Sequence, residues 1–323
     1  MNPLPGRAGV ADAASARSSF LREVIDGLSQ GQRTLPCKFF YDERGAHLFR
    51  TICELPEYYI TRTELQILRL YAAEMAKALG PNIELIGLGT GAGTKTRILL
   101  EELPQPAVYI PIDISSEQLQ RSADRFREML PGLEILPIAA DYLEPIELPL
   151  PRKPSSRSVV YFPGSTIGNF EPDFAVHFLH RLADLCGEGG GLLIGVDLVK
   201  DGQIIEEAYN DSKGVTAQFN LNLLSRINDE LGANFDLKNW RHRAIYNSKE
   251  SRIEMYLISQ ADQQVRIAHR TFAFAAGEKI LTEYSYKHTP DGFAALARVA
   301  GFRFEKLWTD DARLFGVFYF TVR

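Results

Sequence analysis

The stretch NIELIGLGTGAGTKTRILLEEL, residues 82–103, decides the fold of this chain. Its first eight residues, 82–89, form a short apolar run that ends in glycines, which predicts a buried strand. Residues 94–103 predict a helix, so a glycine-rich loop connects a strand to a helix. In open α/β sheets, ligands bind beside loops of this kind, outside the carboxyl ends of the strands.

Helices and strands alternate on both sides of this stretch. An amphipathic helix is expected over 63–79, with Thr63 as its N-cap. Further strands are predicted over 108–115, 133–142 and 190–199, and residues 158–170 predict a strand that runs into a glycine-rich loop. Helices are expected near 115–130 and 172–185. The alternation predicts a doubly wound parallel sheet. The carboxyl ends of its strands then carry the glycine loop, Asp113, Asp141, the GSTIGN loop of residues 164–169 and Asp197.

The alternation stops near residue 200. The sequence predicts helix over residues 203–232 and strands over residues 243–286. It then predicts a helix over residues 290–301, followed by a final antiparallel hairpin. A doubly wound sheet closed by such a hairpin is the architecture of class I methyltransferases, an α/β, Rossmann-like fold. We therefore expect a methyltransferase domain, residues 61–199 and 287–323, that binds the cofactor. Residues 1–60 and 200–286 are expected to form a smaller α+β domain that binds the substrate.

Composition narrows the class of protein. The 323 residues carry a net charge of −5, which provides no basic surface for nucleic acid or an anionic membrane. Cys37, Cys53 and Cys186 contain no CxxC pair, so reduced thiols in a cytoplasmic protein are expected rather than a disulfide framework or a zinc site. No apolar run is long enough for a membrane helix. The N-terminus lacks the apolar core of a secretory signal, and an organelle transit peptide is the weaker alternative.

The glycine loop, GLGTGAGTKT at residues 87–96, can be compared with three known ligand-binding motifs. A phosphate-binding P-loop is excluded because Thr94 separates Gly93 from Lys95. A dinucleotide fingerprint fits weakly from Gly87 to Ala92. The third template is the GxGxG of enzymes that bind S-adenosylmethionine. Asp113 suits a ribose in either cofactor, and Asp141, at the end of the next strand, favours S-adenosylmethionine.

Five longer motifs carry a resemblance to a known family. They are LPEYYITRTE (55–64), GTGAGTKTRILL (89–100), YFPGSTIGN (161–169), DLVKD (197–201) and GEKILTEYSYK (277–287). In their order and spacing the chain resembles the histidine-specific N-alpha-methyltransferases of ergothioneine biosynthesis, the EgtD-like enzymes, from about residue 15 to the C-terminus. The resemblance implies that the chain converts histidine to hercynine, its trimethylated betaine, with S-adenosylmethionine as methyl donor and no metal.

The resemblance also implies site residues. Tyr41 and Asn169 are expected beside the reacting amine. The residues expected to bind histidine are Tyr58, Asn169 and Tyr209 near its carboxylate and amine, and Met255, Glu283 and Ser285 around its imidazole ring. Those expected to bind the cofactor are Tyr41, Gly89, Lys95, Asp113, Asp141 and Tyr142. Gly87 departs from the family, which usually has an acidic residue at this position.

The chemistry required is an in-line displacement, for which the protein mainly supplies positioning. The matched motifs contain no obvious strong base, so water or Tyr41 is the expected proton acceptor. Glu283 and Ser285, two apart on a strand, share one face and can bond the two ring nitrogens. The alternatives are a related enzyme acting on another amino acid or an indole amine, an NAD-dependent oxidoreductase and a non-catalytic binding protein. We expect a monomer with no nucleic-acid or membrane partner.

Overall fold

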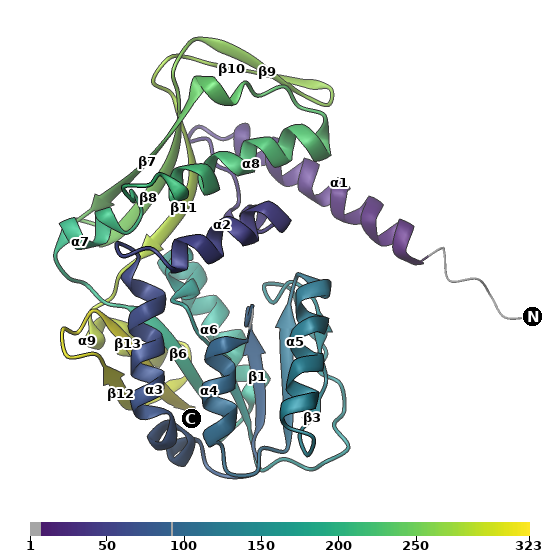
Figure 1. The fold of residues 1–323 in the computed structure, drawn as a ribbon, viewed down its shortest axis with the longest axis vertical. Coiled ribbons are helices and arrows are strands. Elements are labelled where there is room, and N and C mark those ends of the chain that lie inside the picture. The colour runs from purple at the N-terminus through teal and green to yellow at the C-terminus, as the bar shows by residue number, and fades with distance from the viewer. Residues whose placement is uncertain (1–7, 92) are drawn as a thin grey trace, which may run out of the picture. The chain divides into compact units, whose positions relative to one another are not determined.

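The computed structural model describes residues 8–91 and 93–323, with side chains described from residue 17 onward (Figure 1). The start of the N-terminal segment considered as a transit peptide, and Ala92 of the glycine loop, lie outside the described residues. The contacts divide the chain into two compact units. Unit 1 comprises Met1–Tyr59 and Asp201–Ser285, and unit 2 comprises Ile60–Lys200 and Tyr286–Arg323.

Unit 2 is built on one large sheet in the order β12-β13-β6-β5-β1-β2-β3, with β4 also paired to β2. The strands from β6 to β3 are parallel, whereas β13 runs antiparallel to both β6 and β12. The strands are β1 (Glu84–Leu88), β2 (Val108–Asp113), β3 (Glu134–Ile135), β4 (Ile138–Ala139), β5 (Ser158–Phe162), β6 (Gly191–Asp197), β12 (Phe302–Thr309) and β13 (Phe315–Val322). This is the sheet of a class I methyltransferase, so the expected fold class is confirmed.

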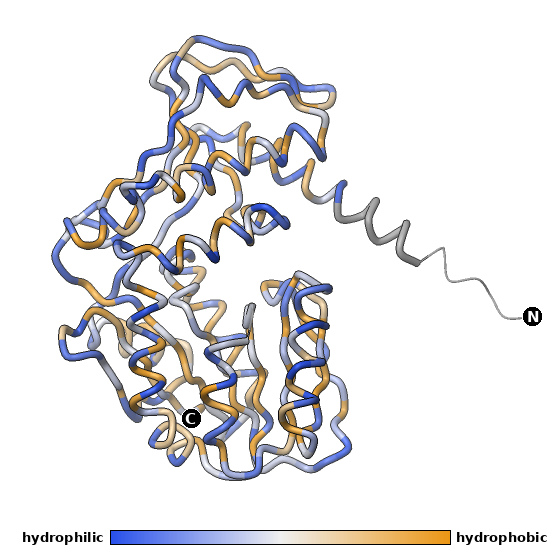
Figure 2. Tube along the Cα trace, viewed as in Figure 1, coloured by the Kyte–Doolittle hydropathy of each residue, from blue (hydrophilic) through white to orange (hydrophobic). Residues whose placement is uncertain are grey.

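Helices cover both faces of this sheet, as a doubly wound fold requires. They are α3 (Tyr59–Leu79), α4 (Thr94–Glu102), α5 (Ser116–Met129), α6 (Pro172–Cys186) and α9 (Pro290–Val299), with a short 3-10 helix η2 (Thr166–Asn169). On one face, Ile86 and Val160 pack with Phe178 of α6 and Phe293 of α9 in one buried cluster. On the other face Tyr109 contacts Phe126 of α5. Figure 2 shows helices such as α5 with alternating hydrophilic and hydrophobic residues, as this packing demands.

Unit 1 combines helices with two small antiparallel sheets. Its helices are α1 (Ala8–Leu28), α2 (Glu43–Cys53), α7 (Gly202–Glu207) and α8 (Val215–Leu231), with 3-10 turns η1 (Cys37–Phe40) and η3 (Leu237–Asn239). One sheet has the order β11-β8-β7 and the other pairs β10 with β9. The strands are β7 (Trp240–Asn247), β8 (Arg252–Ser259), β9 (Gln263–Ile267), β10 (Arg270–Phe274) and β11 (Lys279–Tyr286).

Backbone hydrogen bonds connect the two sequence segments of unit 1. The Leu35 amide donates to the Leu281 carbonyl at 2.9 Å, and the Leu281 amide donates to the Arg33 carbonyl at 2.9 Å. The Asn222 amide group of α8 also donates to the Asp42 carboxylate at 2.8 Å. The segment before residue 60 and the insertion after residue 200 therefore fold as one body.

Three local predictions were wrong. Thr63 is not an N-cap, because α3 begins one turn earlier at Tyr59 and Thr63 lies buried within it. The strand expected over 133–142 is two short pieces, β3 and β4, and Asp141 follows the second. The helix expected over 203–232 is interrupted between α7 and α8. The Asp211 carboxylate accepts hydrogen bonds from the Val215 and Thr216 amides, which restarts the helix there.

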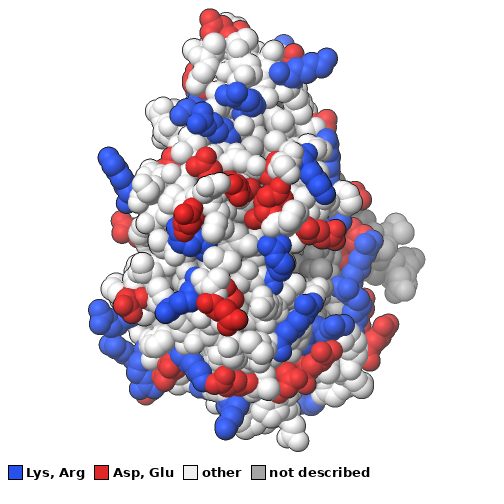
Figure 3. All heavy atoms as spheres, turned by 60° about the vertical axis from the view of Figure 1, so that its left-hand side comes forward, with Lys and Arg blue, Asp and Glu red and all other residues white. Residues whose placement is uncertain are grey.

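Among the described residues, no helix is both long and apolar enough to cross a bilayer. On the face drawn in Figure 3, basic and acidic side chains are interspersed rather than gathered by sign.

Candidate active site

The glycine loop after β1 has the backbone conformation that makes glycine necessary. Gly89, Gly91 and Gly93 have φ of 56°, 52° and 75°, in the left-handed region. At Gly93 a Cβ would also lie 2.7 Å from the Ser122 hydroxyl oxygen of α5. Side chains at these positions would be strained, and the loop therefore exposes its backbone at the carboxyl end of β1, where an α/β sheet binds ligands.

Two predicted cofactor carboxylates follow the next strands. Asp113 ends β2, where its carboxylate accepts hydrogen bonds from the Gly91 amide at 3.3 Å and the Ser115 amide at 3.0 Å. Asp141 follows β4 and accepts from the Leu143 amide at 2.9 Å. A carboxylate accepts up to about four hydrogen bonds, so the Asp113 carboxylate can also accept from a ligand hydroxyl. Parallel pairing places both at the same edge of the sheet as the glycine loop.

Tyr142 lies against this loop. A Cβ at Gly89 would be 3.4 Å from the Tyr142 ring, and the ring itself packs on Phe162 with centroids 5.6 Å apart. An adenosyl sulfonium compound needs an aromatic surface for its base, carboxylates for its ribose and amine groups, and exposed backbone for its amino-acid part. This edge of the sheet offers all three. The residues at this edge of unit 2 therefore fit S-adenosylmethionine.

Gly87 stands where the family usually has an acidic residue, and the structure leaves little space for a side chain there. A Cβ there would lie 2.6 Å from the Thr90 methyl group and 3.1 Å from the Tyr109 hydroxyl. The space that a side chain would need is filled by these two neighbours, so an acidic residue at position 87 would require them to move. Burial raises the pKa of Tyr109 to about 12, so its hydroxyl stays protonated and supplies no charge in place of the missing carboxylate.

Lys95 and Asn169 belong to two elements of unit 2 that approach each other. The Lys95 ammonium lies 2.5 Å from a carboxylate oxygen of Glu64. The same carboxylate accepts from the Gly164 amide, at the start of the loop that ends in Asn169. Asn169 is the last residue of η2 and is partly exposed. The structure thus joins Lys95 to the Asn169 loop through Glu64, a residue that lies in a quoted motif but received no role from the sequence.

In unit 1, an aromatic cluster surrounds the predicted tyrosines. Tyr41 is 42% exposed and lies edge-on to Phe49 and Phe219, with centroids 5.4 and 5.7 Å apart. Phe49 also contacts Tyr58, which contacts Tyr209 at 6.2 Å. Asp42 fixes the start of α2 by accepting from the Gly45 amide at 2.7 Å. The capping residue beside Tyr41 therefore sets the direction in which the chain enters this cluster.

Two buried hydroxyl groups meet beside this cluster. The Tyr209 hydroxyl and the Ser285 Oγ are 2.8 Å apart, and both side chains are buried. Burial, and then the neighbouring Tyr209, raises the pKa of Tyr58 well above its usual value, so its phenol remains a hydrogen-bond donor. The cluster therefore offers neutral hydroxyl groups, which suit a carboxylate ligand.

Glu283 and Met255 lie on neighbouring strands of the same sheet. Glu283 is partly exposed on β11 and lies two residues before Ser285, on the same face of the strand. Met255 is fully buried on β8, and its carbonyl accepts from the Thr282 hydroxyl at 3.1 Å. The structure thus brings Tyr58, Tyr209 and Ser285 together, with Glu283 two residues before Ser285 on β11. Met255 is placed beside β11 through its backbone.

Sequence reasoning missed the residues that hold Tyr209. The His242 Nε2 lies 2.9 Å from the Tyr209 carbonyl oxygen, and its Nδ1 lies 2.9 Å from the Asn220 amide nitrogen. An Nε2–H donor with Nδ1 as acceptor satisfies both contacts. Burial lowers the pKa of His242, which keeps the ring neutral in this role. No spacing in the sequence predicts this hydrogen-bond network, because Asn220 and His242 come together only where α8 packs on β7.

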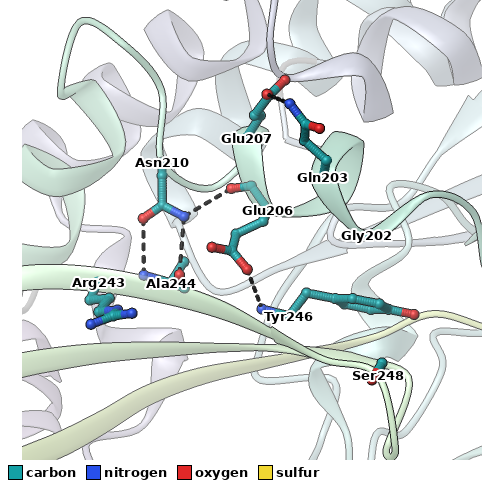
Figure 4. Close-up of a pocket in the computed structure, with 9 residues that line it drawn as sticks. All are labelled: Gly202, Gln203, Glu206, Glu207, Asn210, Arg243, Ala244, Tyr246 and Ser248. Carbon is teal, nitrogen blue, oxygen red and sulfur yellow. Dashed lines mark hydrogen bonds between the residues drawn. The ribbon is translucent and has the colours of Figure 1, made fainter.

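Asn210, next to Tyr209, anchors the end of α7 to β7 (Figure 4). Its amide accepts from the Ala244 amide and donates to the Ala244 carbonyl, both at 3.1 Å. The Glu206 carboxylate accepts from the Tyr246 amide at 3.0 Å. These groups line an open groove in unit 1. Through the bonds of Asn210 and Glu206 to the β7 backbone, this part of the groove supports the position of Tyr209.

Within residues 8–91 and 93–323, no group of three or more His, Cys, Asp or Glu side chains is arranged to hold a metal ion.

The chain is similar in sequence to proteins of known function. Residues 20–322 match the profile of a family described as histidine-specific methyltransferase, SAM-dependent. The histidine N-alpha-methyltransferase of Mycolicibacterium smegmatis is 42% identical over 94% of this chain and 95% of its own length. That of Mycobacterium tuberculosis is 41% identical over 92% of each chain. The ergothioneine biosynthesis protein 1 of Neurospora crassa is 30% identical over 86% of this chain and 32% of its own length.

Proposed function

Because this chain belongs to the family of histidine-specific, S-adenosylmethionine-dependent methyltransferases, we propose that it transfers three methyl groups to the α-amine of L-histidine and releases hercynine. This reaction is the first step of ergothioneine biosynthesis. Membership of the family excludes the NAD-dependent oxidoreductase considered from the glycine loop.

The choice of histidine is supported by the polar groups of unit 1. Glu283 and Ser285 are two apart on β11 and share a face, and Ser285 is hydrogen-bonded to Tyr209. In our proposal Glu283 accepts from one imidazole nitrogen and Ser285 bonds the other, while Tyr58 and Tyr209 donate to the carboxylate. A site built to hydrogen-bond a polar ring rejects analogues that lack the partner atoms, because its own polar groups are then left unpaired.

Holding the substrate has a cost at the Tyr209–Ser285 pair. In the structure each hydroxyl is a partner of the other, and a hydrogen bond between them uses one of their two protons. A ligand that accepts from both must break that bond, whereas a ligand that accepts from one and donates to the other can keep part of it. In the arrangement proposed here, a neutral ring donates its one N–H to Glu283 and accepts from Ser285, so it breaks the bond between the two hydroxyls. A charged ring has two N–H donors and can donate to Ser285, which leaves that bond in place.

Bound S-adenosylmethionine supplies an electrophilic methyl group, so the residues mainly need to orient the amine. We propose that Asn169 and Tyr41 position the nitrogen and that its proton passes to water or to the Tyr41 phenol. Neutral groups such as these can still bind the amine after one or two methyl groups have been added. An ion pair that depends on several N–H donors of the amine would be lost as methyl groups replace those hydrogens. The quaternary product has no N–H left to donate, which favours its release.

Reaction with histidine and excess S-adenosylmethionine tests the proposal. Mass spectrometry should show the addition of three methyl groups, and fragmentation should place them on the α-nitrogen. A product that stops at one methyl group, or that carries it on a ring nitrogen, would refute the assignment. Parallel reactions with tryptophan and tyrosine should give no product, and turnover of either instead of histidine would favour a related enzyme for another amino acid.

We further infer that the protein works as a monomer on free histidine in the cytoplasm. Each predicted group already comes from this one chain. Sedimentation at assay concentration checks the monomer, and a dimer whose dissociation abolishes turnover would contradict it.

A further inference from the structure

A buried carboxylate with no role in the mechanism so far lies in unit 2. Glu64 of α3 is 1% exposed, although a charged side chain at such a depth costs several kcal/mol unless it is paired. It is paired in two directions. Both of its oxygens lie 3.0 Å from the Gly164 amide nitrogen, and one lies 2.5 Å from the Lys95 ammonium.

The sheet is adapted to receive this carboxylate. Gly195 of β6 lies directly beneath it, and a Cβ at that position would overlap the Glu64 Oε1. Gly164 has φ of 88°, which only glycine adopts without strain. The glycine in the strand below thus makes room for the acidic side chain, and the glycine in the loop beside it supplies the backbone amide that donates to it.

The two partners of Glu64 lead to two different parts of the candidate site. Lys95 is the second residue of α4, immediately after the glycine loop, and is predicted to bind the cofactor. Gly164 begins the loop that ends in Asn169, which is predicted to hold the substrate amine. The next residue, Ser165, is also fixed, since its Oγ accepts from the Asp197 amide at 2.8 Å. The Glu64 carboxylate is therefore the direct connection between the cofactor helix and the amine loop.

We propose that Glu64 is a positioning residue for methyl transfer, which holds the Lys95 ammonium and the loop 164–169 in one fixed arrangement. It touches neither substrate. It acts by orienting the Lys95 side chain towards the cofactor and by fixing the position of the loop that carries Asn169. The proposal rests on the proposed function and adds a residue to it. It also explains why a position so far from the glycine loop in sequence carries a buried charge.

Glutamine at position 64 tests the arrangement with little change of volume. Its amide oxygen can still accept a hydrogen bond, but the side chain carries no charge to pair with the Lys95 ammonium, and an NH2 donor takes the place of the second acceptor oxygen. The matched control is Glu134→Gln. Glu134 likewise accepts from a backbone amide, that of Arg152, and pairs with the Arg152 guanidinium, but it lies on β3 away from the carboxyl edge. Both variants therefore lose a carboxylate with the same types of partner.

The first measurement is S-adenosylhomocysteine affinity by calorimetry for wild type, Glu64→Gln, Glu134→Gln, Lys95→Met and the Glu64→Gln/Lys95→Met double variant. Glu64→Gln should bind roughly 5- to 50-fold more weakly, as expected for loss of a charge-assisted contact. The control should bind like wild type. The double variant should bind within about twofold of Lys95→Met, because residues that act through one another are not additive.

The second measurement is kcat and KM for histidine at saturating S-adenosylmethionine, with thermal melting of each variant. Glu64→Gln should lose on the order of 10- to 100-fold in kcat, because small misplacements of reacting groups are costly, while KM for histidine changes less. Glu64→Asp keeps the charge but is one methylene too short to reach both partners. It should show the same pattern and provides the test if the glutamine variant does not fold.

Wild-type cofactor affinity and kcat in folded Glu64→Gln or Glu64→Asp, with only the melting temperature lowered as in Glu134→Gln, would overturn the proposal. Losses that multiply in the double variant would overturn it too, since Glu64 would then not act through Lys95. Binding of S-adenosylhomocysteine requires no histidine. Failure of wild type to methylate histidine would therefore refute the proposed function, while the binding data would still decide the role of Glu64.

Discussion

Replacement of Glu283 by alanine is the most direct test of histidine recognition. Glu283 is partly exposed on β11 and shares a face of that strand with Ser285, which is buried and hydrogen-bonded to Tyr209. Hydrogen bonds to charged groups contribute about 1.5–3 kcal/mol when buried and less when exposed. A half-buried carboxylate that accepts from an imidazole N–H should therefore contribute about 2 kcal/mol, which corresponds to roughly 30-fold in histidine affinity.

The assay is calorimetric titration of histidine into protein saturated with S-adenosylhomocysteine, with a separate titration of the cofactor product alone. The matched control is Glu254→Ala. Glu254 lies on the neighbouring strand β8, where its carboxylate bonds to Arg252, Asn247 and the Tyr256 hydroxyl. It is adjacent to Met255 in sequence and so points to the opposite face of the strand.

Glu283→Ala should lose histidine affinity by about 30-fold and keep its affinity for S-adenosylhomocysteine, whereas Glu254→Ala should keep both. A solvated surface glutamate would change binding by no more than about 0.5 kcal/mol, roughly twofold. Equal histidine affinity in folded Glu283→Ala and wild type would refute the reasoning. It would also remove most of the structural argument for histidine over other amino acids.

Three further predictions concern other groups. Asp113→Ala should weaken S-adenosylhomocysteine binding by about 1.5–3 kcal/mol, because the ribose loses a charged acceptor; unchanged affinity in calorimetry would remove Asp113 from the cofactor site. Tyr209→Phe removes the hydrogen bond to Ser285 and should lower both thermal stability, by about 1 kcal/mol, and histidine affinity, with cofactor binding as the invariant control. Burial lowers the pKa of His288 to about 4, so the folded protein binds fewer protons than the unfolded chain below pH 6.5 and loses stability as the pH falls. That loss should be about 1.3 kcal/mol between pH 7.5 and 5.5, and denaturant titrations should show a correspondingly smaller pH dependence for His288→Gln if the interpretation is correct.

The sequence by itself determined the sheet and the position of its ligand edge. Apolar runs ending in glycine or aspartate, separated by amphipathic helices, are local patterns, so β1, β2 and the order of elements could be predicted without contacts. The glycine loop could be predicted from the run of glycines after β1, and the structure shows Gly89 and Gly91 in the left-handed region, which glycine adopts most readily. The assignment to a histidine methyltransferase came from the five long motifs in their order and spacing. Single residues such as Glu283 or Met255 would not have been enough to identify the family.

The tertiary structure decided what depends on partners distant in sequence. The start of α3 at Tyr59 and the division of the third strand into β3 and β4 were not visible in local propensity, which tertiary packing overrides. His242 and Asn220 meet only because α8 packs on β7. Glu64 acquired its partners because α3 lies over Gly195, 131 positions further along the chain. A buried charge is stable only where the fold brings its counter-charge and donors to it, and no sequence spacing records such a meeting.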